Sequence, residues 1–583
     1  MFLDLKIKGG TIVDGSGNAG YTGDIGVKDG RIVEIGRVNA AAAREIDADG
    51  ALVTPGFIDM HTHYDAQVMW DQDFIMSARH GVTTAVMGNC GVGVAPCKPE
   101  SRSDIVSLLS GVEDIPVPAL EAAMIWDWQT FPEYLAVIDS RSRTIDIAAY
   151  VAHAPVRDFV MGERGHDRTP ATPEDCARMA GVVREALEAG AVGFSTDRIF
   201  EHRMGNGAHV PDYDASAEEL LAIADAVRAV PGRTIQFASD FHQFRGRETM
   251  WQDVELLEAI ARRGQCPVSM QLLEWPNLGE NGWREIRDRL EGFNAAGNRI
   301  RFEVPIRAIG LMLGLGLSLH PFLMHPSYAE LRDLPLAERA TRMRNPDMRA
   351  RMLAETATGK SGNDTLDEMI AAMAVLGDRI YRSTPSRAFE PTREDSIAAV
   401  AEVRGQTVME AYYDILSAGD GSTTIYWPLR NFEQGNLDVV REMLMDGSAL
   451  MSFGDAGAHA SMICDSAYTT FALSYWARDR ELGERIPIER LVHLMSGAQA
   501  SHFGMQDRGQ LKLGLRADIN VIDPATVRLE AMSTANDLPG GCQRMLQFAK
   551  GYRTTLVAGT AIVVDDQLTG ERPGRLMRAG MRA

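Results

Sequence analysis

Two histidines separated by a single residue are the sharpest chemical feature of the sequence. His61 and His63 end the segment PGFIDMHTH, which leads from an apolar run into the pair. Alternate residues of an extended chain point to the same side, so the two imidazoles can bind one metal ion. The structural alternative is a pair of exposed loop histidines, but the position directly after an apolar strand favours a metal site.

An acidic residue follows a second apolar run near the other end of the chain. Asp455 stands in the segment MSFGDAGAH, immediately after that run. A carboxylate in this position can bind a metal ion and act as general base toward a metal-bound water. A helix N-cap is the structural alternative. Together with His61 and His63, the pattern favours the catalytic interpretation.

Motifs of other hydrolases and of nucleotide-binding proteins are incomplete in this sequence. The segment GFSTD around Ser195 lacks the final glycine of a serine-hydrolase elbow. The segment TGKS at 358–361 ends like a phosphate-binding loop, but Ala354 stands where the first glycine should be. The sequence contains neither an HExxH motif nor a dinucleotide-binding fingerprint after a strand. These departures leave the histidine pair and Asp455 as the best-supported chemistry.

The elements that must position these residues follow an alternating pattern. Between residues 55 and 500, short apolar runs alternate with longer amphipathic stretches, which is typical of βα units and a parallel sheet. One helix is predicted over 173–189, with Thr172 as N-cap and Gly190 at its end. Eight predicted strands indicate a (β/α)8 TIM-like barrel, in which active sites lie at the C-terminal ends of the strands. These strands are 52–60, 83–88, 145–152, 191–195, 234–239, 267–272, 300–305 and 450–454.

A long insertion is predicted between the seventh and the eighth strand. About 145 residues separate them, far more than a βα connection needs. Helical segments around 328–355, 366–377 and 396–413 predict a helical lid at about 320–445 over the barrel mouth. A purely structural excursion is the alternative.

The two ends of the chain predict a small composite β domain. Residues 3–36 contain short alternating runs broken by Gly-Gly and Asp-Gly pairs, which are hairpin signals. Similar β-branched runs recur near the C-terminus. We therefore predict a composite β-sandwich domain from 1–54 plus 503–583, and a hydrolase barrel from 55–502.

Composition and charge exclude several classes of partner. The 583 residues are 45% hydrophobic and 24% charged, which are ordinary values for a globular protein. The 59 basic and 80 acidic residues give a net charge of −21, which disfavours nucleic acid and anionic membranes as partners. No secretory leader or membrane span is recognisable, and the six cysteines are dispersed. We expect a cytoplasmic protein with reduced thiols and a small-molecule substrate, and the sequence leaves a homo-oligomer open.

Four motifs together resemble one known family. GFIDMHTH after the first barrel strand, GNCG after the second, GFST after the fourth and GDAGAH after the eighth are similar to the amidohydrolase superfamily. Within it they resemble the N-acyl-D-amino-acid deacylase (D-aminoacylase) branch, over nearly the whole chain. The resemblance implies that His61 and His63 are metal ligands, that Asp455 is the strand-eight acid and general base, and that Cys90 is a metal-bridging ligand.

The assignment of Cys90 follows from a difference between branches of the superfamily. Related branches bridge their metals with a carboxylated lysine, whereas no lysine of this chain lies on a predicted barrel strand. The thiolate of Cys90 can take that place. A small buried residue without a ligand role is the alternative.

The fifth and sixth strands lack the histidines of the family pattern. The corresponding segments are QFASDFH at 236–242 and VSMQ at 268–271. Asp240 can replace the first missing ligand, with His242 as the alternative, whereas Gln271 is a poor metal ligand beside an imidazole. One zinc ion is therefore the preferred prediction, and a second ion stays open. The predicted ligands are His61, His63 and Asp455, completed by Cys90 or Asp240.

Residues that bind the substrate are predicted around the barrel mouth. The deacylases carry a lysine shortly after the sixth-strand histidine to hold the substrate carboxylate, but this chain has LLE at 272–274. Arg198 and Arg203, just after GFST, can supply a guanidinium instead, with surface salt bridges as the alternative. The further predicted binding residues are His202, which can polarise a carbonyl or donate a proton, His153, which alternatively satisfies polar groups of the core, and Gln271.

These observations predict a metal-dependent amidohydrolase. The preferred substrate is a linear N-acyl amino acid, with the D series as first choice, or a related small amide. The alternatives are a hydrolase of cyclic amides, esters or lactones on the same scaffold, and a barrel that has lost catalysis and serves as a binding protein. The missing histidines motivate the last alternative, and His61, His63 and Asp455 argue against it.

Overall fold

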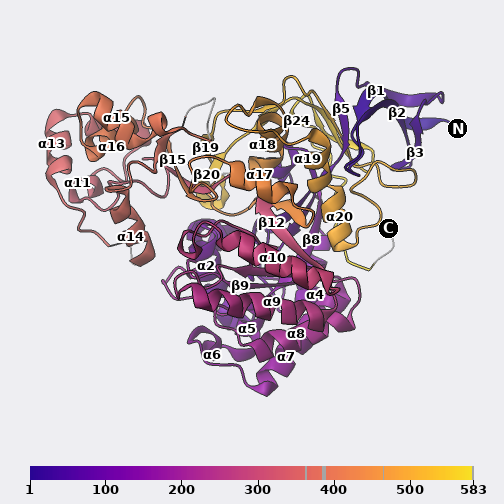
Figure 1. Ribbon diagram of the computed structural model, residues 1–583, viewed down its shortest axis with the longest axis horizontal. Helices are drawn as coiled ribbons and strands as arrows, with labels where there is room; N and C mark the ends of the chain where they lie inside the picture. Colours follow the sequence, from indigo (N-terminus) through magenta and orange to yellow (C-terminus); the bar gives the residue numbers. More distant parts are fainter. Residues whose placement is uncertain (361–363, 384–388, 464, 581–583) are drawn as a thin grey trace.

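Eight parallel strands form a nearly closed barrel at the centre of the molecule (Figure 1). The computed structural model describes residues 1–360, 364–383, 389–463 and 465–580. The first and last barrel strands meet through a parallel bridge between Thr62 and Ala456. In spatial order the strands are β16 (Ala449–Ser452), β12 (Ile300–Pro305), β11 (Val268–Gln271), β10 (Thr234–Ser239), β9 (Gly193–Arg198), β8 (Asp146–Ala152), β7 (Val82–Met87) and β6 (Phe57–Thr62).

The barrel strands are buried on both faces, which explains why near-continuous apolar runs predicted them correctly. All eight predicted strands overlap an observed one. The first prediction was wrong in its first half, because 52–60 contains two elements. β5 (Leu52–Pro55) belongs to the β domain and β6 begins at Phe57. Gly56 separates them, and a Cβ atom there would lie 2.3 Å from Oγ1 of Thr83, so only glycine fits this turn.

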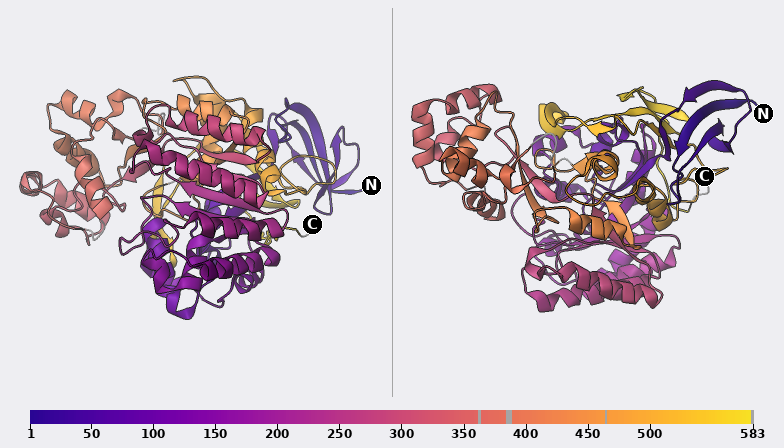
Figure 2. Two further views of the ribbon diagram at one scale, coloured as in Figure 1. Left: turned by 60° about the horizontal axis from the view of Figure 1, so that its bottom comes forward. Right: turned by 45° about the horizontal axis from the view of Figure 1, so that its top comes forward.

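Helices cover the outside of the barrel and follow the predicted βα alternation (Figure 2). The prediction for 173–189 is confirmed: α7 (Pro173–Ala189) begins with Thr172 accepting a hydrogen bond from Asp175 N and ends at Gly190, whose φ is 119°. The other helices of this part are α1 (Ile75–Ala78), α2 (Arg102–Val112), α3 (Val117–Ala123), α4 (Phe131–Asp139), α5 (His153–Met161), α6 (Glu163–His166), α8 (Ala217–Ala229), α9 (Met250–Gly264), α10 (Gly282–Ala295), α17 (Asp438–Met445), α18 (Tyr468–Phe471), α19 (Ile488–Leu494) and α20 (Gly497–Phe503), with a π-helix at Ala472–Asp479.

A nine-stranded sheet combines both ends of the chain beside the barrel. Its N-terminal hairpins extend to one side in all views (Figures 1 and 2). β5 from the N-terminal part pairs antiparallel with β17 from the C-terminal part, which joins the two halves. The strands are β1 (Leu3–Ile12), β2 (Tyr21–Lys28), β3 (Arg31–Gly36), β4 (Ala42–Asp47), β5, β17 (Ile519–Ile522), β22 (Tyr552–Val557), β23 (Thr560–Val564) and β24 (Gln567–Leu568).

Two C-terminal segments leave this sheet and contact the barrel, although sequence patterns placed all of 503–583 in the β domain. The hairpin of β19 (Ser533–Leu538) and β20 (Cys542–Leu546) reaches the barrel mouth, where Met545 N donates to Ala460 O at 2.6 Å. The last described residues run along the opposite end, where Met577 N donates to Ile147 O at 2.7 Å. Two short strands on either side of the β19–β20 hairpin in the sequence, β18 (Arg528–Leu529) and β21 (Ala549–Lys550), pair with each other.

The insertion between β12 and β16 is helical, as predicted, and forms a separate lobe with its own apolar core around Phe322, Met373 and Tyr413. The lobe stands to one side of the barrel in all three views, so a covering role as a lid stays a prediction (Figures 1 and 2). Its elements are β13 (Ile309–Leu313), α11 (Pro326–Ala329), α12 (Leu336–Met343), α13 (Pro346–Ala354), α14 (Asp364–Met373), β14 (Tyr381–Arg382), α15 (Ile397–Arg404), α16 (Val408–Leu416) and β15 (Ile425–Arg430).

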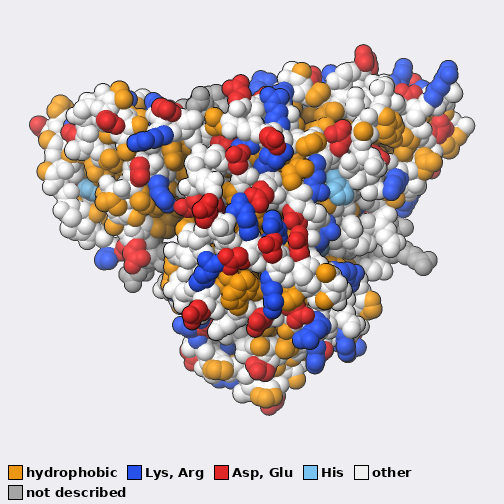
Figure 3. Space-filling model, in the orientation of Figure 1, with side chains coloured by type: hydrophobic (Ala, Val, Ile, Leu, Met, Phe, Trp, Pro, Cys, Tyr) orange, Lys and Arg blue, Asp and Glu red, His pale blue; other side chains and the backbone are white. Residues whose placement is uncertain are grey.

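The structure shows how the charged side chains are distributed over one face and how apolar the helices are. On the face seen in Figure 3, acidic and basic side chains are interspersed over the barrel rather than gathered into a basic surface. Among the helices of the described residues, none is both long and apolar enough to cross a membrane.

A buried ion cluster joins the N-terminal end of the barrel to the β domain. Arg508, whose side chain is 1% exposed, donates to Asp146 Oδ2 at 2.7 Å and to Thr84 Oγ1 at 2.8 Å. Arg516 donates to Asp518 Oδ1 at 2.9 Å and also contacts Asp146. Because the carboxylates are buried, their charges depend on these guanidinium groups.

We predict that Arg508→Met destabilises the protein by about 3–5 kcal/mol, because it leaves buried carboxylates without their main partner. The measurement is the midpoint of thermal unfolding by scanning calorimetry. Arg184→Met is the matched control, since Arg184 forms an exposed pair with Glu188 on α7, and such pairs contribute at most about 1 kcal/mol. Equal midpoints for the two variants would contradict the prediction.

Candidate metal centre and active site

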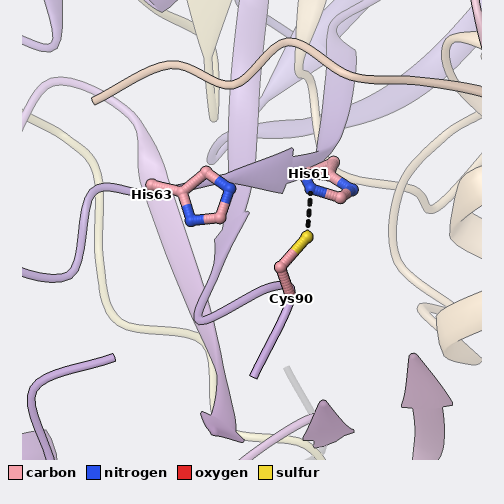
Figure 4. Close-up of side chains that lie close together, drawn as sticks. All are labelled: His61, His63 and Cys90. Carbon is pink, nitrogen blue, oxygen red and sulfur yellow. Dashed lines mark hydrogen bonds between the residues drawn. The ribbon is translucent and has the colours of Figure 1, made fainter. Parts of the chain in front are cut away.

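Four side chains from three barrel strands converge at the C-terminal end of the barrel. The ligand atoms of His61, His63 and Cys90 all lie within 4.8 Å of one another, and Cys90 Sγ is 3.2 Å from His61 Nε2 (Figure 4). Oδ1 of Asp455 lies 3.5 Å from His61 Nε2 and 3.7 Å from His63 Nε2. Two imidazoles, a thiol and a carboxylate thus lie close enough together to bind a metal ion.

Backbone geometry at the strand ends aims these side chains. His61 lies in β6 and His63 directly follows it, so the extended chain presents both imidazoles at the barrel mouth. Cys90 follows β7 with a φ of 53°, and its N–H donates to Gln236 Oε1 at 3.0 Å. Asp455 follows β16 with a φ of 42°, and its N–H donates to His61 O at 3.0 Å. Left-handed conformations at two non-glycine residues are a strain that clusters at functional sites.

A buried carboxylate lies beside the other nitrogen of each imidazole. Oε2 of Glu303, on β12, lies 2.7 Å from His61 Nδ1 and also accepts from Ser452 at 2.9 Å. Oε1 of Glu113, just after α2, lies 3.1 Å from His63 Nδ1. The Glu303 carboxylate keeps a proton on Nδ1 of His61 and leaves the lone pair on Nε2, which is how metal-binding histidines are oriented. Glu113 lies close to His63 Nδ1, but these two atoms form no hydrogen bond with each other.

The electrostatics of the cluster fit a cation. Burial raises the pKa of Cys90 to about 12, that of Glu113 to about 8 and that of Asp455 to about 6. Each of these groups pays a desolvation cost to become an anion, and a divalent cation among them offsets that cost. Imidazole, thiolate and carboxylate are also the ligands that zinc prefers, so the donor set fits this ion.

Two glutamine amides contact Cys90 from the fifth and sixth strands of the barrel. Gln236 lies on β10 and accepts from the backbone of Cys90, while Gln271 Nε2 at the end of β11 donates to Cys90 Sγ at 3.5 Å. Asp240 is turned to the backbone instead: its oxygens accept from Phe200 N at 3.2 Å and from His242 N at 2.9 Å.

Three predicted substrate-binding residues have internal partners. Arg198 is buried and donates to Asp253 Oδ1 at 2.9 Å and to Ala215 O at 2.8 Å. His153 is buried between Thr196 and Glu219, with 2.9 Å to an oxygen of each. Arg203 donates to Phe200 O at 3.0 Å, and its guanidinium lies over the Phe200 ring.

His202 differs from these residues because it is partly exposed and belongs to an ion pair. Its Nδ1 lies 2.6 Å from Oδ2 of the fully buried Asp197, and its side chain is 24% exposed. Burial lowers the pKa of His202, but the Asp197 carboxylate outweighs this effect and raises the pKa to about 9. His202 is therefore a protonated donor at neutral pH. It also lies close enough to act electrostatically on Glu113 and Asp455.

Sequence patterns missed four residues of this site: Glu113, Glu303, Asp197 and Gln236. The sequence could have indicated Glu303, because it is a charged residue inside the apolar run IRFEVP. Asp197 stood in the GFSTD segment, but only as a test of a serine motif. Glu113 follows α2, outside any motif, and only the folded chain brings it to His63.

Comparison with known proteins identifies the family. A family model described as amidohydrolase family matches residues 44–563. The chain belongs to this family. The amidohydrolase is 26% identical to a D-aminoacylase of Alcaligenes xylosoxydans xylosoxydans, over 99% of this chain and 97% of the relative. It is 28% identical to an N-acyl-D-glutamate deacylase of the same organism, over 99% and 96%.

A solved structure shares the fold of this amidohydrolase. The N-acyl-D-glutamate deacylase from Bordetella bronchiseptica, complexed with zinc and a phosphonate inhibitor, has a TM-score of 0.64 and is 24% identical, covering 99% of this chain and 100% of that one. This likeness shows the predicted barrel and β domain. The family match and the full-length relatives make the protein a metal-dependent hydrolase of carbon–nitrogen bonds in the D-aminoacylase-like branch.

We predict that Glu303→Gln weakens metal binding by about 10- to 100-fold, because His61 loses the carboxylate that orients it and raises its basicity. The measurement is the dissociation constant for zinc by competition with a chromophoric chelator. Ser452→Ala is the matched control, since it removes one hydrogen bond to Glu303 and keeps the carboxylate. Unchanged affinity in Glu303→Gln, or an equal loss in both variants, would contradict the role of this pair.

Proposed function

We propose that this amidohydrolase removes the acyl group from N-acyl amino acids, with the D series as preferred substrates. The observation that carries the proposal is Asp455 Oδ1 at 3.5 Å and 3.7 Å from the two imidazole nitrogens. A carboxylate in this position can serve both the ion and the reacting water. Full-length similarity to a D-aminoacylase and an N-acyl-D-glutamate deacylase supports the substrate class.

The chain's own residues provide the proton transfers in the proposed reaction. A bound zinc ion would activate the attacking water and polarise the scissile carbonyl. Asp455 takes a proton from the water and delivers it to the leaving nitrogen as the C–N bond breaks. Burial raises the pKa of Asp455 to about 6, which makes its carboxylate a stronger base toward the water proton than an ordinary aspartate.

His202 is the proposed donor to the carbonyl oxygen as negative charge develops there. Its proton-bearing imidazole is partly exposed and held by Asp197 at 2.6 Å. A fixed donor aimed at a developing oxyanion is among the strongest contributions to acyl-transfer catalysis. We assign no binding role to Arg198 and His153, whose polar atoms have the internal partners described above.

We propose one zinc ion per chain, bound by His61, His63, Asp455 and Cys90. Gln236 and Gln271 support this stoichiometry, because neutral amides are weak zinc ligands and both already contact Cys90. Asp240, the other proposed fourth ligand, is less favoured because its oxygens accept hydrogen bonds from the backbone.

Asp455→Asn is expected to lower kcat on N-acyl-D-amino acids by at least about a thousandfold, because the amide cannot accept the proton from the attacking water. Hydrolysis is measured by ninhydrin detection of the released amine, with zinc content and circular dichroism as controls for the site and the fold. A wild type that releases no amine from a broad panel of N-acyl amino acids would overturn the proposed substrate class. A fully active Asp455→Asn would overturn the mechanism.

The pH profile of kcat/KM tests His202 separately. A protonated His202 is present below its pKa of about 9 and is lost as the pH rises through that value, so activity should fall on the alkaline side. His202→Gln should lower kcat by about 100-fold and remove that limb. Asp197→Asn should move the limb to lower pH, since the carboxylate is what raises the pKa. An unchanged profile in both variants would exclude His202 as the donor.

A further inference from the structure

A cavity beside the metal centre has one wall from the C-terminal hairpin. The residues that line it include Asp455 and His459 after β16, Tyr64 and Trp70 after β6, and Arg544 on β20. Asp455 is the proposed general base, so the cavity reaches the proposed catalytic carboxylate. Arg544 comes long after Asp455 in the sequence, yet it shares this cavity with the catalytic carboxylate.

The hairpin is fixed at the mouth by contacts on both sides of Arg544. Met545 N donates to Ala460 O at 2.6 Å, next to the loop that carries His459. At the hairpin turn, Gly540 lies against Pro118 of α3, where an added Cβ would be 3.4 Å from the Pro118 carbonyl oxygen. The position of Arg544 is therefore set by the barrel as well as by its own strand.

Arg544 is the only lysine or arginine among the described residues that line the cavity. The lining carboxylates, Asp455 and Asp465, would repel an anionic substrate if no cation faced them. His459 does not supply this charge, because burial lowers its pKa to about 3. Arg544 is therefore the positive charge that this wall of the cavity offers to a substrate carboxylate.

Other arginines near the site are committed to buried or partly buried carboxylates. Arg307 contacts Asp465 at 2.6 Å and Arg430 contacts Glu201 at 2.7 Å. Arg544, in contrast, donates from Nε and Nη2 to Asp537, at 2.8 Å each, and Asp537 is 44% exposed on the same hairpin. The Arg544 side chain is itself 14% exposed, and its Nη1 takes no part in this pair, so Nη1 is the guanidinium nitrogen that can receive a second carboxylate.

The geometry points to Arg544 as the residue that binds the substrate α-carboxylate, in place of the lysine that this chain lacks at 272–274. This inference rests on the proposed function. A planar guanidinium can donate two parallel hydrogen bonds to a carboxylate. Trp70, Met76 and Ile115 also line the cavity, which favours an apolar substituent on the same substrate.

The test compares kcat/KM for N-acetyl-D-leucine and its neutral primary amide, N-acetyl-D-leucinamide, on zinc-loaded enzyme. Arg544→Met should lower kcat/KM for the acid by about 10- to 100-fold, the effect of losing charged hydrogen bonds. The amide should be hydrolysed at an unchanged rate. Arg544→Lys should give an intermediate preference, since it keeps the charge and loses the fork.

Asp537→Asn is the matched control, because it breaks the same ion pair and keeps the cation. It should retain the preference of the wild type for the acid. If Asp537→Asn and Arg544→Met lost the preference for the acid equally, Arg544 would have only a structural role. The same would follow if Arg544→Met lost activity equally on the acid and the amide. Either result would overturn this inference but leave the proposed function standing. A wild type that hydrolyses neither compound nor any other N-acyl amino acid would overturn the proposed function, and the inference with it.

Discussion

The site depends on the seam where the first and last barrel strands meet. Asp455 N donates to His61 O, and His63 N donates to Ala456 O at 2.9 Å. These two backbone bonds bring the histidine pair and the acid together from opposite ends of the barrel sequence. If the barrel were open, each group would still end its own strand, but Asp455 would not face the imidazoles. Closure of the sheet and assembly of the metal centre are thus a single structural event.

Burial of two carboxylates determines the electrostatics of the metal centre. Glu113 and Glu303 are almost completely excluded from water, and each is placed against an imidazole rather than an arginine. Anions in such a position are expensive to maintain unless a positive charge compensates them. Without a compensating cation, the charges of these buried carboxylates destabilise the folded protein. Metal binding is therefore coupled to folding.

The sequence was sufficient for the barrel strands because strands buried on both faces are apolar without interruption. It was also sufficient for the histidine pair and Asp455, which directly follow such strands. It failed at Gly56, since the division between β5 and β6 depends on the close approach of Thr83, a contact distant in the sequence. It failed at Glu113 for the same reason. Arg198 and His153 show the opposite error: polar residues near strand ends suggested substrate contacts, whereas the folded core supplies their partners.

The C-terminal hairpin and tail have a consequence for the way the protein is made and dissected. A nascent chain holds both histidines once residue 63 has left the ribosome, whereas the wall with Arg544 and the segment beside Ile147 follow only after the whole barrel has been synthesised. The metal ligands are therefore present in the growing chain well before the cavity can be completed. A barrel excised at the boundaries 55–502 would carry the metal ligands but lack one wall of its cavity. The barrel and the C-terminal part therefore cannot be separated without loss of the complete site.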